Sequence, residues 1–223
     1  ERPLGEVTYL YVDARYEKVR EAGQVRDAAV LVASGITPAG ERQVLGVSVS
    51  LSEHETHWKD FLKGLKDRGM HGVQLVISDD HSGLGAARRA VLGSVPWQRC
   101  QFHLQQNAGA YVPKQAMVYE VAADIRSMFN APNRHTAGSY LQTAIQKYAK
   151  SAPRLSAWLE ENLAEGFTVF DYPIEHRRSI RTTNSLERIN REIRRRTRVV
   201  GIFPNEASCL RLISALLMEI SEE

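Results

Sequence analysis

A first strand is predicted by the run Val7-Thr8-Tyr9-Leu10-Tyr11-Val12-Asp13, which is rich in β-branched and aromatic residues. Because side chains alternate along a strand, Asp13 lies on the face that also carries Tyr9 and Tyr11. A carboxylate on an otherwise apolar face is costly to bury unless it binds something. The end of this strand is therefore a candidate site as well as the beginning of a sheet.

Further strands follow at regular intervals along the chain. Residues 28–34 and 43–50 are β-rich and are joined by a turn that contains glycine and proline. After an amphipathic helix, residues 73–77 form a short strand of the buried type, followed by a small helix near residues 84–91 and a strand near residues 97–102. Three strands in hairpin order and two more separated by helices predict an α/β fold with a mixed five-stranded sheet flanked by helices.

The pattern becomes helical from about residue 105 onwards, with breaks at Pro113, near residue 130 and at Pro153. We predict an all-α insertion at residues 105–175, between a first core segment at residues 1–104 and a second at residues 176–223. The second core segment contains an arginine-rich helix and a last amphipathic helix.

The composition indicates a folded protein with local basic character. The chain has 223 residues, 43% of them hydrophobic and 25% charged, and a net charge of only +3. Two cysteines are too few for a disulfide framework or a four-thiolate zinc site, which fits a reducing cytoplasm. No apolar run approaches the ~20 residues that span a bilayer, so we expect no membrane partner. Because the chain starts at Glu1 without methionine, we expect it to be a fragment of a longer protein.

Residues 181–198 predict a helix whose bases are all arginine and whose only acids are Glu187 and Glu192. A guanidinium group grips phosphate oxygens at two points, which a lysine ammonium does not. A solvated charged face is the simpler explanation, but solvation gives no reason to choose arginine repeatedly. A carboxylate embedded in such a helix suggests metal-assisted chemistry on a polyphosphate backbone.

Three acids could form a metal site. Asp13 lies late in the first strand, and Asp79 follows the strand at residues 73–77. If these strands are parallel neighbours, both carboxylates project into one cleft at the carboxyl edge of the sheet, where Glu187 could join them. Three carboxylates can hold two Mg²⁺ ions ~3.5–4 Å apart, which clamp the attacking and leaving oxygens in phosphoryl transfer. Oxygen ligands suit Mg²⁺ or Mn²⁺ rather than zinc.

Each acid also has a simpler explanation. Asp13 could cap its strand or pair with Arg15. Asp79 and Asp80 could form an Asx turn that caps the following helix. Glu187 could pair with Arg191 along the helix, which is worth only ~0.2–0.5 kcal/mol.

Five motifs extend this interpretation: Tyr11-Val12-Asp13, Ile77-Ser78-Asp79, Cys100-Gln101-Phe102-His103, Thr183-Asn184-Ser185-Leu186-Glu187-Arg188-Ile189-Asn190 and Arg194-Arg195-Arg196-Thr197-Arg198-Val199-Val200-Gly201-Ile202-Phe203-Pro204-Asn205. With them, nearly the whole chain resembles the catalytic domain of bacterial insertion-sequence transposases of the Mutator type, within the DDE group that has a ribonuclease H-like fold. One departure is Asp80, where the family usually has glycine.

The resemblance implies that Asp13, Asp79 and Glu187 are the catalytic and metal-binding triad, with two Mg²⁺ ions for which Mn²⁺ can substitute. It places Cys100 and His103 in a structural or DNA-contacting element. The expected reaction is cleavage at transposon ends and strand transfer into target DNA, by a homodimer or larger assembly in the bacterial cytoplasm at the nucleoid. A transposase-derived DNA-binding protein without cleavage activity and a ribonuclease H-like nuclease are the alternatives.

Contacts with DNA phosphates, which position the DNA rather than read its sequence, are expected from the polar residues of the arginine-rich region. These residues are Arg177, Arg178, Arg181, Asn184, Arg188, Arg191, Arg194, Arg195, Arg196 and Arg198.

Overall fold

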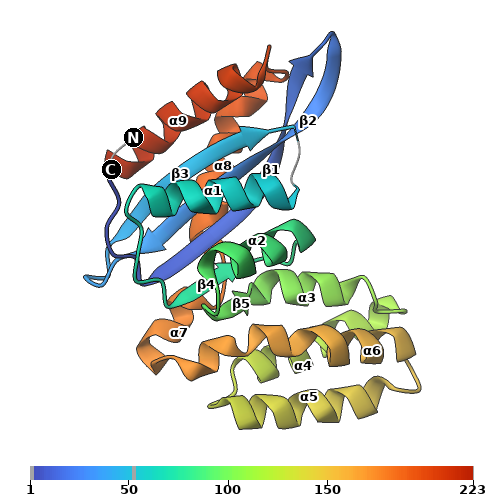
Figure 1. The fold of residues 1–223 in the computed structure, drawn as a ribbon. Coiled ribbons are helices and arrows are strands. Elements are labelled where there is room, and N and C mark those ends of the chain that lie inside the picture. The colour runs from blue at the N-terminus through green and yellow to red at the C-terminus, as the bar shows by residue number, and fades with distance from the viewer. Residues whose placement is uncertain (1–2, 52–53, 223) are drawn as a thin grey trace. The chain divides into compact units, whose positions relative to one another are not determined.

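The computed structural model describes residues 3–51 and 54–222, which group into two compact units. The first unit combines Glu1–Pro96 with Thr183–Glu223, and the second is Trp97–Thr182. Figure 1 shows the elements of both units along the chain. The first unit is therefore assembled from two segments that are far apart in sequence.

A mixed five-stranded sheet is present in the described part of the chain, as the sequence predicts. The strand order is β3-β2-β1-β4-β5. Strands β1 and β2 pair antiparallel, as do β2 and β3, whereas β1 and β4 pair parallel. The strands are β1 (Tyr9–Glu21), β2 (Gln24–Ile36), β3 (Arg42–Ser50), β4 (Leu75–Ser78) and β5 (Trp97–Arg99).

Several strands differ in length from the prediction, and β2, predicted at residues 28–34, runs from Gln24 to Ile36. β1 continues well past Asp13 to Glu21, because no glycine or proline interrupts it before the turn at Ala22 and Gly23, which both have positive φ. β5 ends at Arg99 rather than near residue 102. The next residues instead begin helix α3 (Gln101–Gly109), with Cys100 at the N-cap position.

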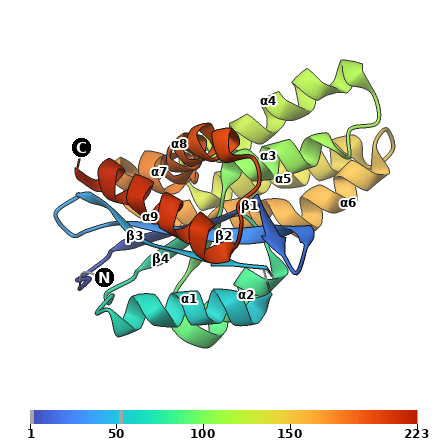
Figure 2. The same ribbon diagram turned by 90° about the horizontal axis from the view of Figure 1, so that it is seen from above.

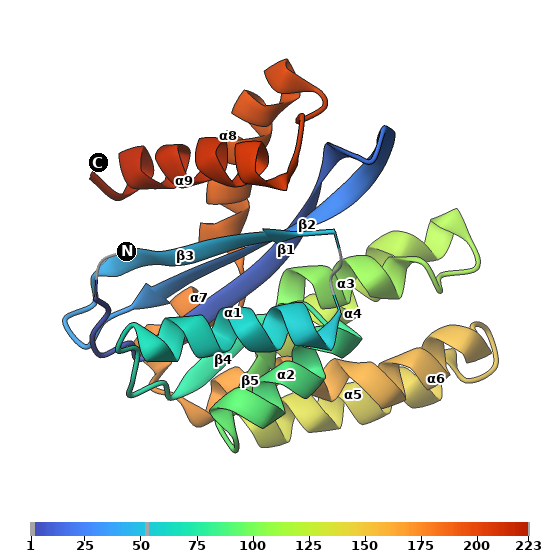
Figure 3. The same ribbon diagram turned by 45° about the horizontal axis from the view of Figure 1, so that its top comes forward.

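Helices of the first unit cover both faces of its strands, as Figure 2 shows. Helices α1 (Glu55–Asp67) and α2 (Ser82–Leu92) lie on one face, and α8 (Asn184–Val200) and α9 (Glu206–Glu222) lie on the other (Figure 3). Because β2 is covered on both sides, every residue from 28 to 33 is completely buried.

The arginine-rich helix is amphipathic. α8 buries Leu186, Ile193 and Thr197, which recur at helical spacing, while most of its arginines are exposed. After the helix ends at Gly201, Phe203 forms a bridge with Val19 of β1. The segment that follows α8 is thus hydrogen-bonded to the second half of β1, next to Val19.

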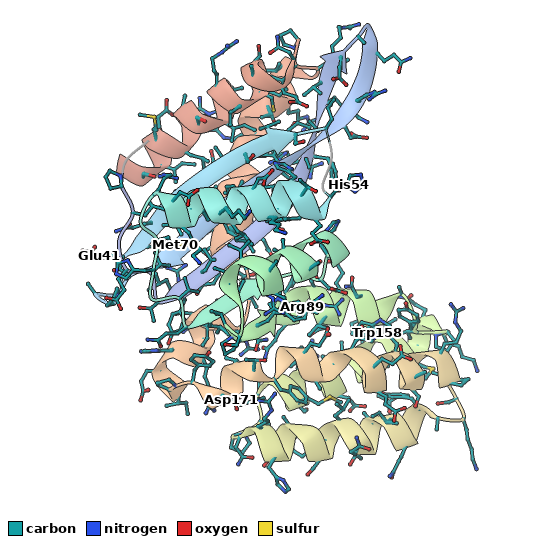
Figure 4. All side chains as sticks on the ribbon, in the orientation of Figure 1. Glu41, His54, Met70, Arg89, Trp158 and Asp171 are labelled. Carbon is teal, nitrogen blue, oxygen red and sulfur yellow. The ribbon has the colours of Figure 1, made fainter. Side chains whose placement is uncertain are left out.

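The second unit is helical apart from β5. The breaks predicted near Pro113 and residue 130 fall between its helices, and Pro153 is the first residue of a helix. The placement of an insertion at residues 105–175 stays a prediction. Trp158, labelled in Figure 4, is buried. Its ring stacks on that of Tyr111, with the centroids 5.5 Å apart. The remaining elements of this unit are η1 (Gln115–Met117), α4 (Val118–Phe129), α5 (Arg134–Tyr148), α6 (Pro153–Asn162), η2 (Leu163–Gly166), η3 (Thr168–Asp171) and α7 (Ile174–Ile180). Across the described ranges, no helix is both long and apolar enough to cross a membrane.

Candidate active site

The parallel pairing of β1 with β4 brings two of the predicted acids to neighbouring strands. The register pairs Tyr9 with Leu75 and Tyr11 with Ile77. Continuing it by two residues sets Asp13 opposite Asp79, just beyond the end of β4. Neighbouring strands lie about 4.8 Å apart, and residues at matching positions point to the same face. The two carboxylates are therefore expected on the same face of the sheet, one partway along β1 and the other just beyond the end of β4.

The same local hydrogen bond orients both aspartates. The amide N–H of Ala14 donates to Oδ1 of Asp13 at 2.9 Å, and the amide N–H of Asp80 donates to Oδ1 of Asp79 at 2.8 Å. Both acids are partly buried, whereas Asp80 is exposed. Helix α2 begins after His81 as its N-cap residue, so Asp80 does not occupy the capping position that the sequence suggested.

Helix α8 packs against β1 with several polar contacts, the first of which involves Asp13. Nδ2 of Asn190 donates to Oδ2 of Asp13 at 2.7 Å, and the Arg15 guanidinium donates to the backbone carbonyl of Asn190. Arg15 also pairs with Glu17 at 2.5 Å, and Oγ1 of Thr197 donates to Glu17 at 2.9 Å. Burial lowers the pKa of Arg15, an effect that the charge of Glu17 opposes. These contacts hold the helix against the strand over about two turns.

Glu187 lies one helical turn before Asn190, on the flank of α8 that reaches Asp13. A rise of 1.5 Å per residue separates Glu187 and Asn190 by ~4.5 Å along the helix axis. Glu187 is partly buried, and its Oε1 is buried with no hydrogen-bond partner among residues 3–51 and 54–222. Leaving a buried carboxylate oxygen unsatisfied costs upwards of ~1–3 kcal/mol. The acceptor therefore needs a donor or a cation.

The three acids offer the ligand type of a hard divalent cation, although their oxygens do not form a group within 4.8 Å of one another among the described residues. Asp13, Asp79 and Glu187 come from β1, the end of β4 and α8, all within the first unit. They offer only carboxylate oxygens, the ligand type that Mg²⁺ and Mn²⁺ prefer. The buried Oε1 of Glu187 is an acceptor that a water molecule or a cation could satisfy.

The arginines of α8 are all exposed and lie on more than one side of the helix. Asn184 at the start of α8 and Arg178 on α7 are also exposed. Arg195 donates from Nε to Glu192 at 3.0 Å, an exposed pair within one turn that contributes little to stability. The exposed arginines of α8 are Arg188, Arg191, Arg194, Arg195, Arg196 and Arg198.

Arg177 and Arg181, in the second unit, are bound more tightly by the protein. The Arg177 guanidinium donates to the backbone carbonyls of Tyr172 at 3.1 Å and of Phe170 and Pro132 at 3.0 Å. Arg181 donates to Oδ1 of Asn130 at 3.2 Å, and burial lowers its pKa. The predicted phosphate contacts of these two residues stay predictions, and their side chains already support the helical unit.

The Cys100 and His103 motif lies at the start of α3. Cys100 is completely buried, and His103 is partly exposed, with its ring edge against Phe102 at a centroid distance of 5.5 Å. The burial of Cys100 agrees with a packing role for this residue.

The polar contacts between α8 and β1 were not predicted from the sequence. Asp13, Arg15 and Glu17 alternate along β1 and so share one face, which was a readable signal for a polar contact surface. Asn190 and Thr197 share a face of α8 in the same way. Only the fold shows that these two faces meet.

Comparison with known proteins gives a consistent family. A family model described as "Transposase, Mutator family" matches residues 1–223. The transposase for insertion sequence element IS406 of Burkholderia multivorans is 58% identical over 223 residues, covering 100% of this chain and 58% of that protein. The transposase for ISRM5 of Rhizobium meliloti is 45% identical, covering 100% of this chain and 56% of that protein. The transposase for IS1081 of Mycobacterium tuberculosis is 37% identical over 224 residues, covering 100% and 54%. The chain thus spans a little more than half the length of these curated relatives.

Proposed function

We infer the function of this chain from its family and its site: the chain belongs to the Mutator family of transposases, and we propose that it carries the catalytic centre of a DNA transposase. The enzyme would cut DNA at transposon ends and join the ends to target DNA. The observation that supports the proposal is the parallel β1–β4 register, because continuing it two residues past Tyr11 and Ile77 matches Asp13 with Asp79, just beyond the end of β4.

The proposed metal ligands are Asp13, Asp79 and Glu187, which would hold two Mg²⁺ ions, with Mn²⁺ as a substitute. When bound, the ions would activate the attacking oxygen and stabilise the leaving oxygen. The protein's part is to orient the carboxylates: Ala14 and Asn190 each donate to one oxygen of Asp13, and Asp80 donates to Asp79. Glu187 contributes a buried oxygen with no hydrogen-bond donor in the described residues.

Two in-line displacements at phosphorus account for cutting and joining. In the first, water attacks the phosphodiester at the transposon end, and a 3′-hydroxyl leaves. In the second, that 3′-hydroxyl attacks a phosphodiester of the target, and a target 3′-hydroxyl leaves. Both steps need the same stabilisation of charge on phosphate oxygens, so one site can serve both.

The proposed partners are transposon-end DNA and target DNA, contacted through the exposed arginines of α8. Phosphate contacts of this kind position DNA without reading its sequence. Since two ends must be joined to one target, we propose a homodimer or a larger assembly at the bacterial nucleoid.

Alanine variants at each acid test the function in a Mn²⁺-dependent nicking assay on supercoiled plasmid DNA, with joined products scored on end-containing substrates. We expect Asp13→Ala, Asp79→Ala and Glu187→Ala to abolish nicking while DNA binding remains. The matched control is Asp80→Ala, which changes an exposed neighbouring acid and should retain activity.

The other outcomes separate the alternatives. Nicking by Asp79→Ala at the wild-type rate would contradict the assignment of the second acid. A chain that binds DNA but never nicks it would be a transposase-derived DNA-binding protein, and breaks without joined products would indicate a nuclease.

A further inference from the structure

Asn190 makes the side-chain contact that joins the acid-bearing helix to the acid-bearing strand. Its Nδ2 lies 2.7 Å from Oδ2 of Asp13. Chemistry alone assigns the amide orientation, because a carboxylate oxygen accepts from the NH₂ group and repels the amide oxygen. Oδ1 of Asp13 accepts separately from the Ala14 N–H at 2.9 Å. Both oxygens of Asp13 thus accept a hydrogen bond from a neighbouring donor.

The amide oxygen of Asn190 is an unsatisfied acceptor. Since Nδ2 is engaged by Asp13, Oδ1 occupies the other side of the amide group, where it is buried without a hydrogen-bond partner in the part of the chain that the structure describes. Oε1 of Glu187, one turn earlier on α8, is also buried without a hydrogen-bond partner in the described residues. Oδ1 of Asn190 and Oε1 of Glu187 are thus two buried acceptors one turn apart on α8, and each needs a donor such as an ordered water.

The backbone of Asn190 is fixed as well as its side chain. Its carbonyl accepts from Arg15, which pairs with Glu17 at 2.5 Å. Glu17 in turn accepts from Thr197, two turns further along α8, at 2.9 Å. Among the described residues, side chains of α8 thus anchor the helix on β1 at Asp13 and at Glu17, and Arg15 links the second anchor to the Asn190 carbonyl. Only the first touches a proposed metal ligand.

We propose that Asn190 is a positioning residue, which holds the Asp13 carboxylate for a divalent cation and offers Oδ1 to the cation's water shell. This inference rests on the proposed metal site. Mg²⁺ and Mn²⁺ keep several waters in protein sites, and such waters are donors that suit Oδ1 of Asn190 and Oε1 of Glu187. Hydrogen-bond partners of metal ligands affect affinity strongly although they do not touch the metal.

The test measures Mn²⁺ binding to the DNA-free chain from the electron paramagnetic resonance signal of unbound Mn²⁺. We expect Asn190→Ala to raise the Mn²⁺ dissociation constant by ~10–100-fold, the usual effect of removing such a partner. Asn190→Ser is the gentler change, which keeps a short polar group at this partly exposed position, and its constant should lie between those of the wild type and the alanine variant.

Thr197→Val is the matched control, because it removes the other side-chain anchor of α8 without touching Asp13. Its Mn²⁺ dissociation constant should equal that of the wild type. The melting temperature of each variant in chelator, and its increase on adding Mn²⁺, separate a loss of folding from a loss of metal binding.

Two results would overturn the role of Asn190: wild-type Mn²⁺ affinity in both Asn190 variants, or an equal loss of affinity in Thr197→Val, which would mean that only the seating of the helix matters. Asp13→Ala distinguishes this failure from failure of the proposed function. If Asp13→Ala binds Mn²⁺ as the wild type does, the proposed metal site is wrong. If Asp13→Ala loses Mn²⁺ binding while both Asn190 variants keep it, the metal site stands and the role of Asn190 does not.

Discussion

One flank of α8 should carry most of the phosphate contacts that we propose. Arg191, Arg194 and Arg198 follow Glu187 at spacings of four, seven and eleven residues, which keeps them on one face of a helix with 3.6 residues per turn. All three arginines are exposed. A DNA strand that reaches Glu187 would therefore pass along these three guanidinium groups.

The perturbation is the triple variant Arg191→Ala, Arg194→Ala, Arg198→Ala. Removing one arginine–phosphate interaction reduces the slope of log K against log salt by ~0.9, so removing three should flatten the slope by ~2.7. Binding to a fluorescent duplex, measured by anisotropy across a series of salt concentrations, gives the slope directly. The effect should not depend on the DNA sequence.

The control is a second triple variant on the same helix, Arg188→Ala, Arg195→Ala, Arg196→Ala. It removes the same charge from exposed positions that face away from the Glu187 flank, and one of them, Arg195, pairs with Glu192. We expect a clearly smaller change of slope. Equal flattening by both triples would refute the reasoning, since it would mean that α8 acts through diffuse charge rather than through one aligned face.

Two further predictions concern stability. Gly166→Ala should destabilise the second unit by ~1–3 kcal/mol, because the added Cβ would lie 2.8 Å from Cδ1 of Leu104 and 3.0 Å from Cε1 of Phe129. In Gly138→Ala, on α5, the added Cβ meets nothing within 4 Å, so this variant should stabilise the unit by ~0.5–1 kcal/mol. Urea unfolding measures both changes, and the same sign for the two variants would contradict the packing argument. Burial, together with the nearby charge of Glu17, raises the pKa of the Cys209 thiol from 9.0 to about 12. The thiol of the unfolded chain therefore ionises at lower pH than that of the folded chain. The contribution of this group to stability is intact below about pH 9 and is lost as the pH rises towards 12. Cys209→Ala should lose less stability than the wild type over that pH range in denaturant titrations, and an identical alkaline decline would show that the thiol does not contribute.

The positions of the elements could be predicted from sequence because they depend on local patterns. The alternation in residues 7–13, the apolar spacing in α1 and α9 and the breaks at Pro113 and Pro153 depend on neighbours within a few residues. Strand lengths were harder to predict, because the outer half of β1 is stabilised by pairing with β2 rather than by its own composition. The candidate acids were also readable, since carboxylates at strand ends and within an arginine-rich helix are unusual in sequence.

The sequence by itself determined the order of strands and helices, the amphipathic character of α8 and the chemical types available for a site. Only the tertiary structure decided that β1 and β4 are parallel neighbours with Tyr11 opposite Ile77, and that Asn190 of α8 donates to Asp13. The physical reason is that hydrophobic periodicity specifies which face of an element is buried but not which element covers it. Contacts between segments as distant as residues 13 and 190 exist only after the chain has closed a long loop and packed α8 against the sheet.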